Sequence, residues 1–126
     1  MSYKNLEIWK LAREVSLEIH KMTLTELPSH ELYETGSQIR RSSNSVRTNI
    51  VEGYGRRRSK KEFLQFLNYA LGSNYETLDH LEILVATGSM MNREKAENLE
   101  KKLTELGKKL RNFIKAVNLH HNDYSS

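Results

Sequence analysis

The apolar residues of this chain recur every three or four positions in four separate segments, and this helical periodicity limits its fold more than any other feature. No segment alternates Val, Ile or Thr with polar residues, which is the pattern typical of a half-buried β-strand. The single proline and several of the glycines lie near the junctions between segments. The sequence therefore predicts an all-α protein with four helices.

Short connections join the four predicted helices. The first three helices are expected to cover about residues 3–24, 31–53 and 59–87, and the fourth begins near residue 92 with heptads that continue to Val117. Ser59 and Asn92 are expected N-caps, whose side-chain oxygens accept free backbone N–H groups. Gly53, Gly55 and Gly88 are expected at helix ends, because glycine adopts left-handed φ values at low cost. Short connections make consecutive helices antiparallel, so we expect an up-down-up-down four-helix bundle.

A chain of 126 residues is long enough for one domain with its own core. We expect that domain to cover residues 1–120 and the tail 121–126 to fray. No cysteine is present, which excludes disulfides and thiolate ligands, and the charged N-terminal segment lacks the apolar stretch of a signal peptide. No apolar run is long enough to cross a membrane, so we expect a cytoplasmic protein.

The third predicted helix is apolar on more than one side. Beyond the residues expected in the core, neighbouring sides carry Leu64, Phe66, Leu71, Tyr75, Ile83 and Val85. A band this wide predicts burial both in the bundle and against another subunit, because large exposed apolar patches are rare on monomers. Gly72 in the same helix costs about 1 kcal/mol of helix propensity, which we expect close packing to offset.

The positive charge of the chain is concentrated between Arg40 and Lys61. The basic residues of this segment are Arg40, Arg41, Arg47, Arg56, Arg57, Arg58, Lys60 and Lys61. Only Glu52 opposes them, so the segment carries +7 and the remainder of the chain carries −3. Such a concentration attracts polyanions, and Arg, Lys, Ser, Thr and Asn side chains are common ligands of nucleic-acid phosphates. We therefore predict that these basic residues form a phosphate-binding surface for RNA or DNA.

This basic segment has two further interpretations, and both stay open. It could be a solvated turn, or its arginines could pair with acidic residues of a neighbouring subunit. The stretch GYGRRR lacks the glycine spacing and the Lys-Ser/Thr ending of a nucleotide-binding loop, and no strand precedes it. Tyr54 is the only tyrosine inside the segment, so it is the candidate for stacking on bases.

The sequence predicts no catalytic or metal site. Asn49 and Glu52 resemble an acid–base pair, but we expect them to stabilise the helix end or to bind Arg40 or Arg41. Glu76 and His80 are four residues apart instead of the three of di-iron bundles, and the spacing is not repeated. No nucleophile has an evident histidine and acid to activate it. We therefore expect no enzyme activity, no metal and no cofactor.

Several motifs of the chain resemble those of a known family. They are the opening LEIWKLAREV, the stretch QIRRSSNSVRTNIVEGYGR and the later KKEFLQFLNYALGSNYETLDHL. In this combination, across about residues 3–118, they are similar to the four-helix bundle proteins encoded in intervening sequences of bacterial 23S ribosomal RNA genes. The chain departs from the family pattern at Ser42, Ser43 and Asn44, where Ala usually follows the double Arg. It also has Arg47 and Thr48 where a Pro is common.

The resemblance implies an antiparallel bundle that assembles as a ring-shaped homopentamer. A related branch, similar to the accessory proteins of diversity-generating retroelements, implies a basic barrel that binds nucleic acid and a reverse transcriptase. The intervening-sequence branch itself has no firmly assigned biochemical role. We therefore expect a non-enzymatic bundle that binds nucleic-acid phosphates with low sequence specificity. The alternative is a protein-interaction scaffold whose basic rim docks an acidic protein partner.

Overall fold

The computed structural model describes residues 2–126, and four long α-helices contain most of them. The helices are α1 (Glu7–Thr25), α2 (Thr35–Gly55), α3 (Lys60–Ala86) and α4 (Arg93–His120). Three short 3-10 helices complete the chain, and they are η1 (Tyr3–Asn5), η2 (Ser29–Tyr33) and η3 (His121–Asp123). No β-strand occurs in residues 2–126, so the prediction of an all-α protein with four helices is confirmed.

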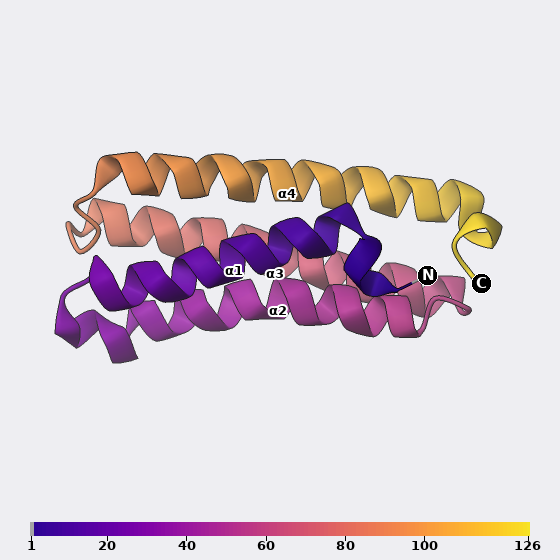
Figure 1. Cartoon of the computed structure of the whole chain (residues 1–126), viewed down its shortest axis with the longest axis horizontal. Coiled ribbons are helices and arrows are strands. Elements are labelled where there is room, and N and C mark those ends of the chain that lie inside the picture. The colour runs from indigo at the N-terminus through magenta and orange to yellow at the C-terminus, as the bar shows by residue number, and fades with distance from the viewer. Residues whose placement is uncertain (1) are drawn as a thin grey trace.

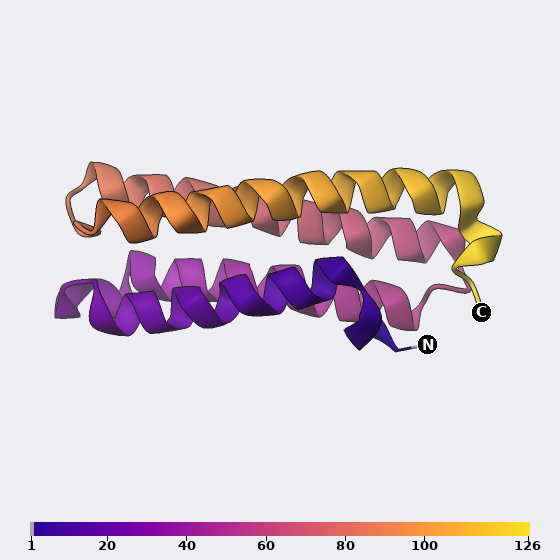
Figure 2. The ribbon, with the colours of Figure 1, turned by 45° about the horizontal axis from the view of Figure 1, so that its top comes forward.

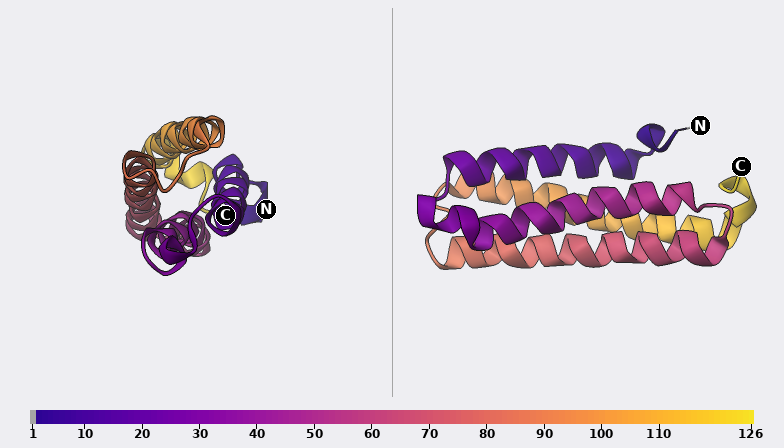
Figure 3. Two further views of the ribbon diagram at one scale, coloured as in Figure 1. Left: turned by 90° about the vertical axis from the view of Figure 1, so that its left-hand side faces the viewer. Right: turned by 90° about the horizontal axis from the view of Figure 1, so that it is seen from below.

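The four long helices lie side by side along one axis and form a bundle (Figure 1). The α1–α2 and α3–α4 connections lie at one end, and the α2–α3 turn lies at the other end together with the N and C ends of the chain (Figures 1 and 2). Each helix packs against two neighbours, because α1 and α3 both contact α2 and α4. The view along the axis shows the helices at the four corners of the bundle (Figure 3).

Local sequence signals explain most of the helix ends. The Ser59 hydroxyl accepts the backbone N–H of Glu62 at 3.2 Å, and the Asn92 side-chain oxygen accepts that of Lys95 at 3.2 Å. Both predicted N-caps are therefore confirmed. Gly88 lies just beyond the end of α3 with a φ of +81°, a left-handed value that favours glycine. Its predicted place at a helix end is also confirmed.

The predicted end of the second helix near Gly53 is two residues too early, because α2 ends at Gly55, whose expected place at a helix end is confirmed. Gly53 and Gly55 both lie inside α2, and within residues 2–126 only Gly88 has a positive φ. The Arg56 N–H still bonds to the carbonyls of Glu52 and Gly53, so the helical pattern continues to the end of α2. The reason for glycine at position 53 is therefore space and not backbone conformation.

The predicted start of the second helix is also too early. Residues 29–33 form η2, and α2 begins only at Thr35, after a sharp turn at Glu34 with φ −108° and ψ −118°. A Cβ atom at Gly36 would lie 2.4 Å from the carbonyl oxygen of Glu31. The tight fit of η2 against the first turn of α2 thus requires glycine at position 36.

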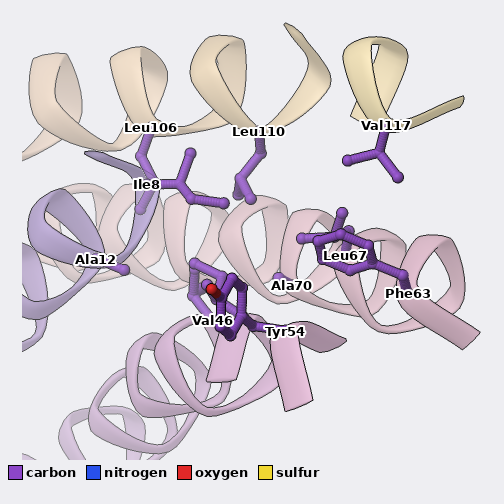
Figure 4. Close-up of a cluster of buried hydrophobic side chains, with 11 residues drawn as sticks. Ile8, Ala12, Val46, Tyr54, Phe63, Leu67, Ala70, Leu106, Leu110 and Val117 are labelled. Carbon is purple, nitrogen blue, oxygen red and sulfur yellow. The ribbon is translucent and has the colours of Figure 1, made fainter. Parts of the chain in front are cut away.

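The interior contains two apolar clusters, one toward each end of the bundle. The cluster near the α2–α3 turn, shown in Figure 4, consists of Ile8, Ala12, Val46, Ile50, Tyr54, Phe63, Leu67, Ala70, Leu106, Leu110 and Val117. The cluster near the other end consists of Val15, Ile19, Met22, Ile39, Leu81, Leu84, Met90, Ala96, Leu99 and Leu103. Their members follow the heptad-like stripes of the sequence, as the periodicity predicts.

A layer of buried polar side chains lies between the two clusters. The Thr77 hydroxyl donates to the Ser42 hydroxyl at 2.8 Å, and the side-chain amide of Asn74 donates to the Leu103 carbonyl at 2.9 Å. A Cβ atom at Gly107 would lie 3.1 Å from the Asn74 amide nitrogen, so glycine makes room for this contact. Apolar periodicity does not predict this layer, because Asn74 and Thr77 occupy stripe positions that it assigns to apolar residues.

Helices α2 and α3 approach each other closely. A Cβ atom at Gly53 would lie 3.1 Å from the Phe66 Cβ and 3.4 Å from the Phe63 carbonyl oxygen. Nearer the middle of the bundle, the hydroxyls of Ser45 and Ser73 are hydrogen-bonded at 2.9 Å. The small side chains at positions 45 and 53 of α2 therefore let α3 come near.

The tail, for which we predicted fraying, contacts the α2–α3 turn in this structure. The ring of Tyr124 packs edge-on against Phe113, with centroids 5.4 Å apart. A ring nitrogen of His121 lies 2.7 Å from the Arg57 carbonyl oxygen, and the Arg57 guanidinium donates to the backbone oxygen of Ser126 at 2.8 Å. These contacts connect the end of α4 to the turn.

We expect Gly53→Ala to destabilise the protein by about 1–3 kcal/mol, because the added methyl group meets a Cβ and a backbone oxygen on α3. Gly55→Ala is the matched control, since a Cβ atom there has nothing within 4 Å. The control should leave stability unchanged or raise it by up to about 1 kcal/mol. Urea unfolding followed by circular dichroism measures both. Equal stability of the two variants would contradict the close approach of α2 and α3.

Candidate nucleic-acid interface

Arg40 holds the α1–α2 connection together. Its guanidinium donates to the Thr23 hydroxyl at 2.9 Å and to the Leu32 carbonyl at 2.7 Å. The side chain is half-buried, and it links α1, η2 and α2. Both donor groups are directed at the protein, so Arg40 has a structural role in this chain.

The middle of α2 directs its polar residues in three directions. Asn44 accepts from the Ser16 hydroxyl of α1 at 2.8 Å and from Arg47 at 3.3 Å. Ser45 is directed at α3, as its bond to Ser73 shows. Arg41 is exposed and has no hydrogen bond or ion pair within residues 2–126. A helix with two neighbours has limited free surface, so only part of the predicted phosphate-binding surface of α2 faces solvent.

Arg56 is held by two carboxylates and an aromatic ring. Its guanidinium lies 3.0 Å from Glu52 and 3.0 Å from Glu62, and 5.2 Å from the centroid of the Phe66 ring. The hydrogen bond to Glu52, followed by that to Glu62, raises the pKa of Arg56 above its ordinary value. Arg56 thus joins the end of α2 to the start of α3, and its charge is largely balanced within the chain.

Arg57 packs against the protein instead of pointing into solvent. Its guanidinium lies 4.3 Å from the centroid of the Tyr54 ring and donates to the Tyr54 carbonyl at 3.1 Å as well as to the tail. Tyr54 itself is 8% exposed and belongs to the apolar cluster near the turn. The hypothesis that Tyr54 stacks on bases is therefore wrong, because its ring is covered by the core and by Arg57.

The remaining cations of the turn are free. Arg58, Lys60 and Lys61, which we call the turn cluster, are exposed and have no ion pair or hydrogen bond from their side chains within residues 2–126. Lys60 and Lys61 are the first two residues of α3, and Arg58 lies just before its N-cap. The structure therefore places these three residues at the α2–α3 turn, at one end of the bundle.

The predicted basic residues do not form one compact group. Arg41 and the last residue of α2 are separated by 14 residues, about 21 Å of helix. Arg40 and Arg41 lie toward the α1–α2 connection, whereas the turn cluster lies at the opposite end (Figure 1). A ligand that contacts both groups would have to follow α2 along much of its length.

The other polar candidates have structural partners. The Asn49 amide donates to the carbonyl and the hydroxyl of Ser45 at 2.9 and 3.0 Å, and Glu52 pairs with Arg56. Their predicted structural role is confirmed, although the partner of Glu52 is not Arg40 or Arg41. Within residues 2–126, no three His, Asp or Glu side chains are arranged to hold a metal ion. No helix in this part of the chain has the length and apolarity needed to span a membrane.

The wide apolar band of α3 is only partly accounted for by the bundle. Leu64 and Leu71 pack against the cluster near the turn, and Val85 packs against the other cluster. Tyr69, Tyr75 and Ile83 remain 44–50% exposed. Gly72, between the two tyrosines, is exposed as well, and a Cβ atom there would have nothing within 4 Å. Packing within this chain therefore does not offset the cost of a glycine at the middle of α3.

These observations define the class of the protein as a four-helix bundle with free cations at its α2–α3 turn. Residues 4–112 match the family described as 23S rRNA-intervening sequence protein, and the chain belongs to this family. The chain is also similar to a crystal structure of a protein with unknown function from the S23 ribosomal protein family of Bacteroides thetaiotaomicron. The two are 29% identical with a TM-score of 0.77, and the match covers 86% of this chain and 95% of that one. No curated protein matches significantly.

We expect Arg40→Ala to destabilise the protein by about 1.5–3 kcal/mol, because it removes two hydrogen bonds from a charged donor that link three elements. Arg41→Ala is the adjacent control, and it should change stability by less than about 0.5 kcal/mol, since Arg41 is exposed and free. Urea denaturation measures both. Similar effects of the two substitutions would show that the Arg40 contacts do not support the fold.

Proposed function

We propose that this protein is a non-enzymatic binder of RNA or DNA that contacts phosphates with little sequence preference. The turn cluster makes the main contacts, and Arg41 and Arg47 extend them along α2. Arg40, Arg56 and Arg57 hold the surface in shape through the bonds described above. The turn cluster and Arg41 have this role because their charged groups are free within residues 2–126, whereas Arg47 is half-buried and keeps only one hydrogen bond there, to Asn44 at 3.3 Å.

The observation that carries the proposal is the position of the turn cluster at the N-terminus of a long helix. The aligned peptide dipoles of a helix place about half a positive charge at that end, and each cation there costs about 0.3–1 kcal/mol. Lys60 and Lys61 are the first residues of the 27-residue α3, and their ammonium groups have no acidic partner within residues 2–126. A bound phosphate would relieve this repulsion, since helix N-termini and lysines both favour anions.

The second candidate function is a scaffold that docks an acidic protein partner on the same cations. A flexible phosphate backbone and an acidic protein both supply negative charge, so the site geometry favours neither alone. Salt dependence separates them, because binding to nucleic acid releases a fixed number of condensed counterions for each phosphate contact.

We further propose that this up-down-up-down bundle self-associates through the outer face of α3. The face is defined by Tyr69, Gly72, Tyr75 and Ile83, which the single chain leaves exposed. A glycine flanked by exposed aromatic rings allows a neighbouring helix to approach closely, and apolar groups of this size favour contact with another subunit. Resemblance to the family suggests a ring of five copies. Repetition of the turn cluster around a ring would multiply a weak single contact by avidity.

The binding proposal is tested with a variant in which Arg58, Lys60 and Lys61 are all replaced by Gln. We expect this variant to bind a mixed-sequence RNA more weakly at physiological salt. The slope of log affinity against log salt should become shallower by about 2–3, since each lost phosphate contact removes about 0.7–0.9. Fluorescence anisotropy across a salt series measures the slope for RNA and for DNA.

A variant with Lys10, Arg13 and Lys21 replaced by Gln is the control for net charge. These three residues are exposed on α1, and their substitution removes the same charge as the substitution of the turn cluster. The control should bind with the slope of the wild-type protein. If the wild-type protein does not bind RNA or DNA, or if the slope becomes equally shallow in both variants, the turn cluster is rejected as a specific phosphate site. Either outcome would favour the scaffold.

The association proposal is tested with Gly72→Gln, using Gly55→Gln as the control. Both positions have open space for a side chain within one copy, so both variants should fold. At Gly72 the new side chain should keep the neighbouring copy at a distance and weaken the free energy of association by about 1–3 kcal/mol. This corresponds to about a 5- to 150-fold lower association constant. Sedimentation velocity measures assembly. A monomeric wild type, or unchanged assembly of Gly72→Gln, would refute this interface.

A further inference from the structure

Helix α4 carries an uneven distribution of charge. Its first half mixes four acidic residues with its basic ones, and the last acid is Glu105. From residue 106 to residue 120 there is no Asp or Glu, while the basic residues of this half are Lys108, Lys109, Arg111 and Lys115. The chain outside residues 40–61 has a net charge of −3. This net value does not reveal the four cations of α4, because acidic residues in other segments outnumber them.

Two of these four cations have partners within the chain. Lys109 lies 3.2 Å from Glu7 of α1, and Arg111 donates to the Tyr75 hydroxyl of α3 at 2.9 Å. Lys108 and Lys115 are exposed and have no ion pair or hydrogen bond from their side chains within residues 2–126. They are thus the free cations of this half of α4.

Lys108 and Lys115 lie on the same side of the helix. They are seven residues apart, which is two helical turns and about 10 Å along the axis. The buried residues Leu106, Leu110 and Val117 face the core, so the two lysines face solvent. Both lie before the last turn of α4, where the helix dipole would stabilise a cation, and the dipole therefore does not explain them.

This half of α4 lies beside the turn cluster. The rings of Phe63 and Phe113 pack edge-on with centroids 5.9 Å apart, and His121 reaches the Arg57 carbonyl. The start of α3 and the end of α4 occupy the same end of the bundle in both side views (Figures 1 and 2). No charged residue occurs in α3 between Phe63 and Tyr75, so no acid on that stretch separates the two groups of cations.

Most acids at this end of the bundle are already paired. Glu52 and Glu62 pair with Arg56, and Glu7 pairs with Lys109. Among the described residues at this end, Asp123 of η3 is the acid that has no ion pair. The free charge of this region is therefore strongly positive, in contrast to the mixed charge of the first half of the same helix.

We propose that Lys108 and Lys115 form a second row of phosphate contacts, which continues the turn cluster onto the outer face of α4. This inference rests on the proposed function and adds residues outside the segment that the sequence singles out. A nucleic-acid strand bound at the turn extends along α4 and meets the two ammonium groups in succession. Lysines suit such contacts because they act as mobile point charges and do not select bases.

The test is a double variant with Lys108→Gln and Lys115→Gln, titrated with a mixed-sequence RNA across a salt series. The slope of log affinity against log salt should become shallower by about 1.4–1.8, which corresponds to two phosphate contacts. The control is Arg13→Gln with Lys21→Gln on α1, which removes the same charge and should leave the slope unchanged. A slope in the α4 variant equal to that of the control would overturn the inference.

A second measurement needs no variant. Lysine acetylation of the wild-type protein, quantified by mass spectrometry with and without RNA, should show protection of Lys108 and Lys115 relative to Lys10 and Lys21. Equal modification would overturn the second row. If the turn variant weakens binding and the α4 variant does not, only this inference fails. If the wild type does not bind RNA or DNA, the proposed function fails and this inference fails with it.

Discussion

The close approach of α2 and α3 is the constraint on which the rest of this structure depends. It exists because α2 has small residues where it meets α3, with Gly53 against Phe66 and Ser45 against Ser73. Interiors pack at crystal-like density, so a larger side chain at such a contact would move whole helices. The short distance also fixes where the α2–α3 turn can lie. It allows Arg56 to join Glu52 of one helix to Glu62 of the next.

This arrangement sorts the arginines and lysines of the basic segment into two groups. Arg40, Arg56 and Arg57 contact carbonyls, hydroxyls, carboxylates or rings of their own chain, and so they support the fold. The turn cluster makes no such contacts within residues 2–126. Arg40, Arg56 and Arg57 therefore contribute to stability, whereas the turn cluster is available for the binding that we propose. A count of charge along the sequence cannot make this distinction.

The features that the sequence predicts correctly have local causes. The helices follow from apolar periodicity, and the caps at Ser59 and Asn92 follow from side chains that bond to their own backbone. The features that the sequence does not predict have their cause on another helix. A glycine looks the same in sequence whether it supplies a left-handed φ, as Gly88 does, or space, as Gly53 does. The partners of Arg40 and Arg57 and the burial of Tyr54 depend on tertiary contacts that no single segment encodes.

Most charged side chains in α3 have the same sign as the nearer end of the helix dipole, so they strengthen the electric field of the helix. Lys60 and Lys61 begin it at its positive end, and its remaining acids after Glu62 lie in the second half, nearest the negative end, at Glu76, Asp79 and Glu82. Stability alone favours the opposite order, with acids first and cations last. The observed order makes the start of α3 positive and its second half negative. A positive helix start of this kind is what the proposed function requires, because an electrostatic field steers a polyanion toward the turn from a distance.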